Sequence, residues 1–146
     1  MYVVADTNVL LSAYLFRNST LAWLRAEADA GGLTFAFDPL TAAELKRVLA
    51  YPKFNLHERE QTSVLLRVLV NALVFENATP ANANLPTCRD AADQKFLCLA
   101  SQVVMLHPNM ALVTGDQDLL VLRGQCHFPI CKPTDLQALL AAKRAD

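Results

Sequence analysis

Apolar and polar positions alternate along the chain in a way that predicts repeated strand–helix units. Residues 2–5 form a short apolar run, Asp6-Thr-Asn8 offers side chains that cap helices, and residues 9–16 are an apolar stretch of helical length. A strand that leads directly into a helix is the beginning of a β-α-β unit. Further strands are expected at 33–37, 72–75, 110–114 and 128–131, and further helices at 19–30, 41–50, 57–71, 90–104 and 134–142.

Capping and loop-forming residues set several of these boundaries. Ser19 or Thr20 is expected to cap the second helix. In the third helix, Thr41 is the expected N-cap, and Glu44 stands three residues later in the position of a capping box. The longest expected loop is segment 76–88, which contains two prolines.

Alternating strands and helices with nearly continuous apolar strands indicate the α/β class. We expect a three-layer α/β/α sandwich with a central, mainly parallel sheet of about five strands, because right-handed crossovers place helices on both faces of a parallel sheet. No linker stands out, so residues 1–146 are interpreted as a single domain. Ligands bind such sheets outside the carboxyl ends of the strands. Asp6 follows the first strand and Asp116 follows the fourth, so both carboxylates are expected on the same rim.

Composition and charge narrow the function classes. With 146 residues, of which 53% are hydrophobic, the chain is long enough for one well-packed core. The net charge of −1 does not by itself favour a nucleic-acid partner, so any nucleic acid has to be bound locally. Because the sequence shows no basic leader and no apolar run of membrane-spanning length, we expect a cytoplasmic protein without membrane contact, whose four cysteines are neither disulfides nor zinc ligands.

Acidic side chains gather at four points that the predicted fold places on or beside this rim. They are Asp6, Glu44, Asp90 with Asp93, and Asp116 with Asp118. Taken singly, each acid is explained by helix capping, by the helix dipole or by a turn. Taken together, several neighbouring carboxylates repel one another and stay ionised only if a cation neutralises them.

The residue types of this cluster point to a particular ion and a particular chemistry. Oxygen ligands without histidine or cysteine favour Mg²⁺, or Mn²⁺, over zinc. Such an ion orients and acidifies water for hydrolysis of phosphodiester bonds. The sequence contains neither a phosphate-binding P-loop nor a dinucleotide-binding glycine motif. A phospho-aspartyl mechanism is disfavoured because Asn8 stands where such phosphotransferases carry a second aspartate.

The order of these residues resembles the pattern of the PIN-domain family over nearly the whole chain. The resemblance is carried by Asp6-Thr-Asn8, Glu44, Asp93 and Thr114-Gly-Asp116-Gln-Asp118. Three further segments are similar to the VapC-like branch of the family, which comprises toxins of toxin–antitoxin pairs: Pro52-Lys-Phe54, Cys88-Arg-Asp-Ala-Ala-Asp-Gln-Lys-Phe-Leu97 and Val113-Thr-Gly-Asp-Gln-Asp-Leu-Leu120. The resemblance implies a metal-dependent endoribonuclease with Mg²⁺ or Mn²⁺ as cofactor.

Roles for individual residues follow from the same resemblance. It implies that the catalytic, metal-binding acids are Asp6, Glu44, Asp93 and Asp116, and that Asp118, Asp90, Asn8 and Thr114 support them. The chain departs from the family pattern where two alanines separate Asp90 from Asp93 and where Gln94 replaces a frequent acid. We assign Asp93 to the metal because Ala100 lies seven residues further on, as a small residue does after the family's helix aspartate.

Partners are implied less directly. Candidate RNA contacts, chosen because they lie near acidic points in the sequence, are Arg17, Lys46, Lys53, Arg89 and Lys95. In the resembled family the first two helices contribute to self-association and antitoxin docking, so Tyr14, Phe16 and Trp23 are candidates for a groove, although core packing is the default interpretation of them. We expect a homodimer with a small antitoxin partner. Two alternatives stay open, namely a housekeeping RNA-processing or structure-specific nuclease with the same acids, and a non-catalytic binding module.

Overall fold

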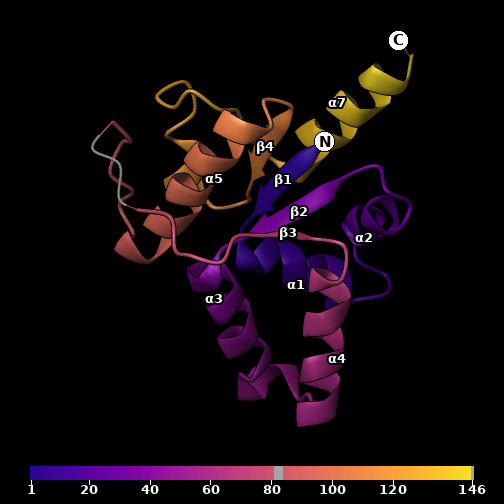
Figure 1. Ribbon diagram of the computed structural model, residues 1–146. Helices are drawn as coiled ribbons and strands as arrows, with labels where there is room; N and C mark the ends of the chain where they lie inside the picture. Colours follow the sequence, from indigo (N-terminus) through magenta and orange to yellow (C-terminus); the bar gives the residue numbers. More distant parts are fainter. Residues whose placement is uncertain (81–83, 146) are drawn as a thin grey trace.

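In the part of the chain that the computed structural model describes, residues 1–80 and 84–145, five strands form one parallel sheet (Figure 1). The strands are β1 (Tyr2–Ala5), β2 (Thr34–Phe37), β3 (Leu73–Val74), β4 (Met110–Val113) and β5 (Ile130–Cys131). Their order is β3-β2-β1-β4-β5, and each neighbouring pair runs parallel. This arrangement confirms the predicted α/β class and the parallel sheet.

Helices connect the strands as the sequence predicts. They are α1 (Thr7–Leu15), α2 (Ala22–Asp29), α3 (Pro39–Leu49), α4 (Glu58–Leu69), α5 (Gln94–Leu106), α6 (Gln117–Leu120) and α7 (Pro133–Ala145). Short 3₁₀ turns at η1 (Pro52–Phe54) and η2 (Ala91–Asp93) precede α4 and α5. The helix expected at 90–104 begins with η2 and continues as α5. Neither η1 nor α6 was predicted, because three or four residues carry too little periodicity to identify a helix.

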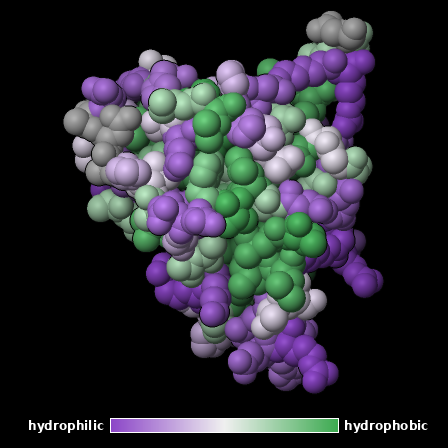
Figure 2. All heavy atoms as spheres, in the orientation of Figure 1, coloured by the Kyte–Doolittle hydropathy of each residue, from purple (hydrophilic) through white to green (hydrophobic). Residues whose placement is uncertain are grey.

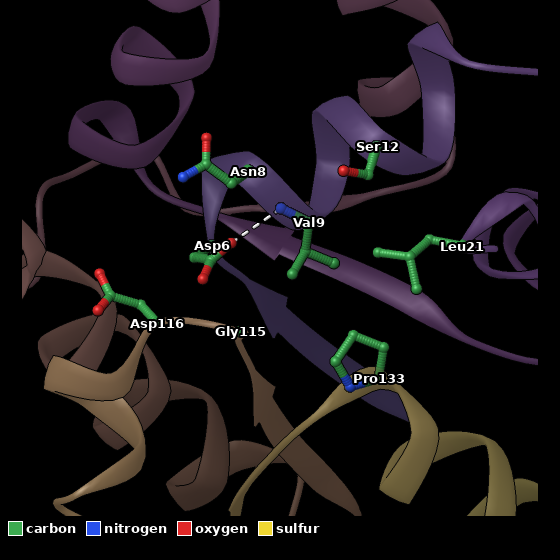
Figure 3. Close-up of a pocket in the computed structure, with 8 residues that line it drawn as sticks. All are labelled: Asp6, Asn8, Val9, Ser12, Leu21, Gly115, Asp116 and Pro133. Carbon is green, nitrogen blue, oxygen red and sulfur yellow. Dashed lines mark hydrogen bonds between the residues drawn. The ribbon is translucent and has the colours of Figure 1, made fainter. Parts of the chain in front are cut away.

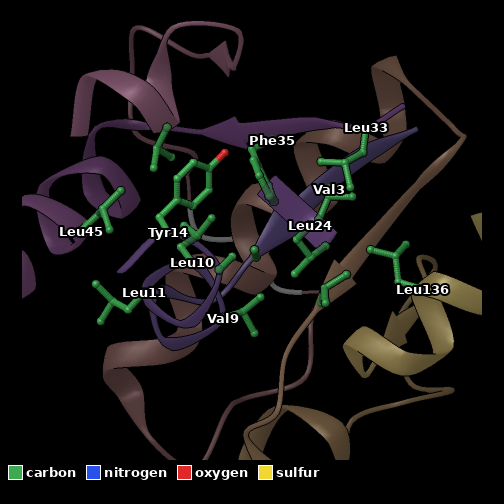
Figure 4. Packing of buried hydrophobic residues seen from close by; sticks show 14 of the residues in the cluster. Val3, Val9, Leu10, Leu11, Tyr14, Leu24, Leu33, Phe35, Leu45 and Leu136 are labelled. Atoms are coloured by element: carbon green, nitrogen blue, oxygen red, sulfur yellow. The ribbon is translucent and has the colours of Figure 1, made fainter. Parts of the chain in front are cut away.

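Alternate residues of each strand point to opposite faces of the sheet and build two apolar cores. Val3 and Ala5 of β1 pack with residues of α1, α2, α3, α4 and α7, whereas Val4 packs with α5 and α6. Figure 4 shows the first core, in which Leu24 and Leu136 approach the sheet from α2 and α7. Helices therefore cover both faces, which confirms the three-layer sandwich.

The start of α3 differs from the prediction. The N-cap is Asp38, whose carboxylate accepts a hydrogen bond of 2.9 Å from the Thr41 N–H, while the Thr41 hydroxyl accepts one of 3.0 Å from the Asp38 N–H. The prediction that Thr41 is the N-cap was wrong because Pro39, whose fixed φ suits the first helical position, starts the helix earlier. Glu44 therefore belongs to no capping box, and its carboxylate is available for other contacts.

The second helix begins later than predicted, whereas the described part of the longest expected loop agrees with the prediction. The helix expected at 19–30 begins only at Ala22, and the Ser19 hydroxyl accepts a 3.0 Å hydrogen bond from the Leu21 N–H in the turn before it. In the expected loop 76–88, the described residues form neither helix nor strand, and residues 81–83 lie outside the described part of the chain.

An apolar area is exposed on one face of the molecule. Figure 2 shows it on the face displayed in Figure 1, over β3 and the C-terminal end of α4. Leu66, Val70 and Val74 in these elements are half or more exposed. The three aromatic residues considered for a groove do not share one surface, because Tyr14 is buried in the core while Phe16 is exposed. No helix in the described ranges is long and apolar enough to cross a membrane.

Candidate active site

Asp6 and Asp116 lie side by side at the carboxyl end of the sheet, as the sequence predicts. Ala5 and Val113 pair in the register of β1 and β4, and the Asp6 N–H continues this ladder by donating to the Val113 carbonyl at 3.1 Å. Thr114 joins the two acids, since its hydroxyl donates to Asp6 Oδ2 and accepts a 2.9 Å hydrogen bond from the Asp116 N–H.

Asp6 is held rigidly in this position. Its Oδ1 accepts a 2.8 Å hydrogen bond from the Val9 N–H at the start of α1, and Thr114 occupies Oδ2. Burial raises the pKa of Asp6, and the hydrogen bonds from Thr114 and Val9 oppose this shift. Asp6 therefore caps α1 while its carboxylate stays on the rim beside Asp116.

Asp93 approaches from the other side, at the junction of η2 and α5. Its pKa is raised to about 6, first by desolvation, then by a hydrogen bond to Asp116 and by the negative charges of Asp90, Asp116 and Glu44. Because the Asp93 and Asp116 carboxyl groups are in contact, protonation of Asp93 lowers the repulsion between them.

Glu44 reaches the same place from α3. Its Oε2 accepts a hydrogen bond from the Thr7 hydroxyl, and its Oε1 lies 2.8 Å from the Lys95 ammonium. Both side chains of the ion pair are largely buried, with 13% of Glu44 and 14% of Lys95 exposed. Arg47 makes a longer contact of 3.7 Å from the solvent side.

One pocket of about 190 Å³ brings the four predicted acids together. It is lined by Asp6, Thr7, Asn8, Glu44, Val48, Tyr51, Lys53, Asp93, Phe96 and Asp116. A second hollow shares its edge: Figure 3 shows Asp6 and Asn8 between Asp116 on one side and the apolar side chains of Val9, Leu21 and Pro133 on the other. The acidic rim therefore faces solvent through concave surfaces that admit an extended ligand.

The two remaining acids lie outside this pocket. Asp90 caps η2 by accepting a 3.0 Å hydrogen bond from the Ala92 N–H. The Asp118 carboxylate pairs at 3.3 Å with the exposed Arg89. The backbone N–H of Asp118 donates to Asp116 Oδ1 at 2.9 Å. Both acids are neighbours of pocket residues and not lining residues.

The predicted RNA contacts divide in the same way. Lys53 lines the pocket, Lys95 is paired with Glu44, and Arg89 is paired with Asp118. Arg17 and Lys46 are exposed and line neither hollow at the acids. Thr7 and Tyr51 were missed by sequence reasoning, although both adjoin motifs singled out there, the Asp-Thr-Asn triplet and Pro52-Lys-Phe54.

The donor set suits a hard divalent cation. Within residues 1–80 and 84–145, no three histidine, cysteine, aspartate or glutamate side chains converge closely enough to form a metal-binding group as they stand. However, the acids of the pocket supply only oxygen donors, which Mg²⁺ and Mn²⁺ prefer. Desolvation and the neighbouring acids, Asp116 first among them, raise the pKa of Asp93, and a cation bound between these carboxylates would offset their repulsion.

Comparison with known proteins agrees with this architecture. No curated protein sequence matches the chain. A family model described as a PIN domain matches residues 2–118, a range that runs from β1 into α6 and contains every acid discussed above. The chain therefore belongs to the PIN-domain family, whose members are generally nucleases that use divalent metal ions.

Proposed function

We propose that the chain is a single-domain, metal-dependent endoribonuclease that hydrolyses RNA phosphodiester bonds. One observation carries the proposal: four acids from distant parts of the chain line one pocket at the carboxyl end of the sheet. Asp6 follows β1, Glu44 lies in α3, Asp93 directly precedes α5, and Asp116 follows β4. A non-catalytic binding module has no use for mutually repelling carboxylates in a concave site, because they cost stability without contributing an interaction.

The residues of the pocket divide the work. The expected metal-binding acids, Asp6, Glu44, Asp93 and Asp116, would surround Mg²⁺ or Mn²⁺ in this pocket. The bound ion would orient and acidify a water molecule and offset charge on the phosphate oxygens. Thr114 fixes the spacing of Asp6 and Asp116 through its two hydrogen bonds. Lys53 supplies a cation at the pocket for the RNA backbone, which the acids otherwise repel.

Cleavage of labelled RNA of mixed sequence tests this proposal. Purified protein is incubated with Mg²⁺, Mn²⁺ or EDTA, alongside Asp6→Asn and Asp93→Asn, with Glu76→Gln as the matched change at an exposed acid outside the pocket. We expect metal-dependent cleavage by the wild type and Glu76→Gln, and none by the two site variants. Equal cleavage by all four proteins would indicate a contaminating nuclease, and no cleavage with any metal would contradict the proposal.

We further propose that this activity serves as the toxin of a toxin–antitoxin pair. The support is the similarity of three segments, around Lys53, Arg89 and Gln117, to the VapC-like branch. Inducing the chain in a bacterial host is expected to arrest growth, and Asp93→Asn is expected to abolish the arrest at equal protein level. A housekeeping nuclease would leave growth unaffected when present at low level.

The expected homodimer and antitoxin complex belong to the same proposal. The apolar area over α4 and β3 supports them, because contiguous exposed apolar surface is typical of protein interfaces (Figure 2). Light scattering on the purified chain tests the dimer, and Val70→Glu, at a residue 73% exposed, is expected to shift it toward monomer if this area is buried between copies.

A further inference from the structure

The four acids of the pocket are not neutralised equally. Lys95 places its ammonium 2.8 Å from Glu44 Oε1, and only 14% of the Lys95 side chain is exposed. The same ammonium donates to the Ala92 carbonyl, so two contacts hold it. A largely buried lysine is costly to desolvate unless a carboxylate is fixed beside it. The pair is therefore a built part of the pocket wall and not a mobile surface contact.

Glu44 has both carboxylate oxygens engaged. Thr7 donates to Oε2 while Lys95 occupies Oε1. Arg47 also approaches Oε1, at 3.7 Å, but 63% of its side chain is exposed and solvent screens its charge. To bind a cation directly, Glu44 has to give up a short, poorly hydrated ion pair.

Asp6, Asp93 and Asp116 are in the opposite condition. Their hydrogen-bond donors are neutral: the Val9 N–H and Thr114 hydroxyl on Asp6, and the Asp118 N–H on Asp116. In the described part of the chain, no lysine or arginine forms an ion pair with any of these three acids.

We infer that Lys95 is the built-in counter-cation of Glu44, so that Glu44 borders the metal position without binding the ion, which Asp6, Asp93 and Asp116 hold. This inference rests on the proposed metal-dependent function. It assigns Lys95 a positioning role in place of the RNA contact suggested by its place in the sequence. It also restricts the pocket to one divalent ion, because the fixed ammonium repels a second ion beside Glu44.

Mn²⁺ binding without RNA tests this assignment, measured by calorimetry and by the electron paramagnetic resonance of free Mn²⁺. The proteins are the wild type, Lys95→Met, the double variant Lys95→Met/Glu44→Gln, and Asp93→Asn. Lys95→Met leaves an uncompensated Glu44 and is expected to tighten Mn²⁺ binding about tenfold. Asp93→Asn removes a ligand and is expected to weaken binding more than about tenfold.

The double variant is decisive because it replaces the ion pair with two neutral side chains. If Glu44 is no ligand, the double variant binds one Mn²⁺ within about threefold of the wild-type affinity, since the net charge beside the ion is unchanged. A double variant that binds as weakly as Asp93→Asn would overturn the inference, and so would Lys95→Met with unchanged or weakened affinity.

Two further variants serve as controls for the charge at position 95 and for the second cation near Glu44. Lys95→Arg keeps the charge and is expected to retain wild-type affinity, and Arg47→Met removes only the exposed partner of Glu44 and is expected to change affinity less than about twofold. Thermal melting in EDTA establishes that each variant is folded. If Lys95→Met alone does not fold, the double variant and Lys95→Arg decide.

RNA cleavage assayed in parallel separates the inference from the proposed function. Cleavage by the wild type together with loss of Mn²⁺ from the double variant overturns the inference alone. The expected Mn²⁺ pattern without any cleavage supports the inference and contradicts the nuclease. A wild type that binds no Mn²⁺ overturns both.

Discussion

The two sides of the acidic pocket use the same kind of side chain in different ways. Glu44, on α3, is neutralised within the chain by Lys95. Asp93 and Asp116, on the opposite side, have no such cation, and desolvation together with the adjacent Asp116 raises the pKa of Asp93 to about 6. A carboxylate that is paired with a lysine is already neutralised, whereas neighbouring carboxylates without such a partner are stabilised by binding a cation. Neighbours, and not residue type, therefore distinguish the members of the cluster.

The largest expected effect is on the side without a counter-cation. We expect Asp116→Asn to lower the rate of RNA cleavage at least about a hundredfold, because it removes a charged group that would hold the ion. The same change is expected to raise the melting temperature in EDTA, since it removes repulsion from Asp93. Single-turnover cleavage and thermal melting measure the two effects. A variant that loses activity and also unfolds more easily in EDTA would point to a structural role for Asp116.

Removing one hydroxyl on each side of the pocket compares how much the two sides depend on neutral hydrogen-bond donors. Thr114→Val loses two hydrogen bonds of a buried hydroxyl, one to the Asp6 carboxylate and one from the Asp116 N–H, and we expect it to lower the free energy of unfolding by about 3 kcal/mol. Thr7→Val loses one bond to Glu44, which Lys95 still neutralises, and we expect a loss of about 1.5 kcal/mol. Urea unfolding measures both. A larger loss for Thr7→Val would contradict the greater dependence of the aspartates on neutral donors.

The smallest expected effect concerns pH. The pKa of Asp93 is raised in the folded state, so its contribution to stability is fully present below the ordinary value near 3.8 and is lost as pH rises through about 6. In EDTA, the wild type is therefore expected to lose stability relative to Asp93→Asn between about pH 4 and pH 6, by the titration of at most one proton. Urea unfolding of both proteins across this range measures the difference. A parallel pH dependence in the two proteins would show that Asp93 keeps its ordinary pKa.

The sequence predicts the rim of the site because the end of each strand can be recognised locally, and a parallel sheet brings these ends together. Asp6 and Asp116 each follow an apolar strand, and parallel pairing of those strands is enough to bring them together. Asp93 depends on more than pattern, because Asp90 fits the head of the helix equally well. In the structure Asp93 lines the pocket, whereas Asp90 caps η2.

Contacts between distant segments could not be predicted in this way. Lys95 and Glu44 are far apart in sequence, and their pairing follows only from how α5 and α3 pack across the pocket. Nearness in sequence to an acid was a poor guide to RNA contacts, since it selected Lys95 and Arg89, which the folded chain pairs with carboxylates. The cap of α3 was misjudged because Asp38 and Thr41 satisfy each other, so either suits the start of a helix.

The most direct test of whether Glu44 binds the metal ion is anomalous diffraction from crystals of the chain grown with Mn²⁺. We expect one manganese peak per chain, bound by Asp6, Asp93 and Asp116, with the Lys95 ammonium still on Glu44. A manganese ion bound directly to Glu44, with Lys95 displaced into solvent, would contradict it.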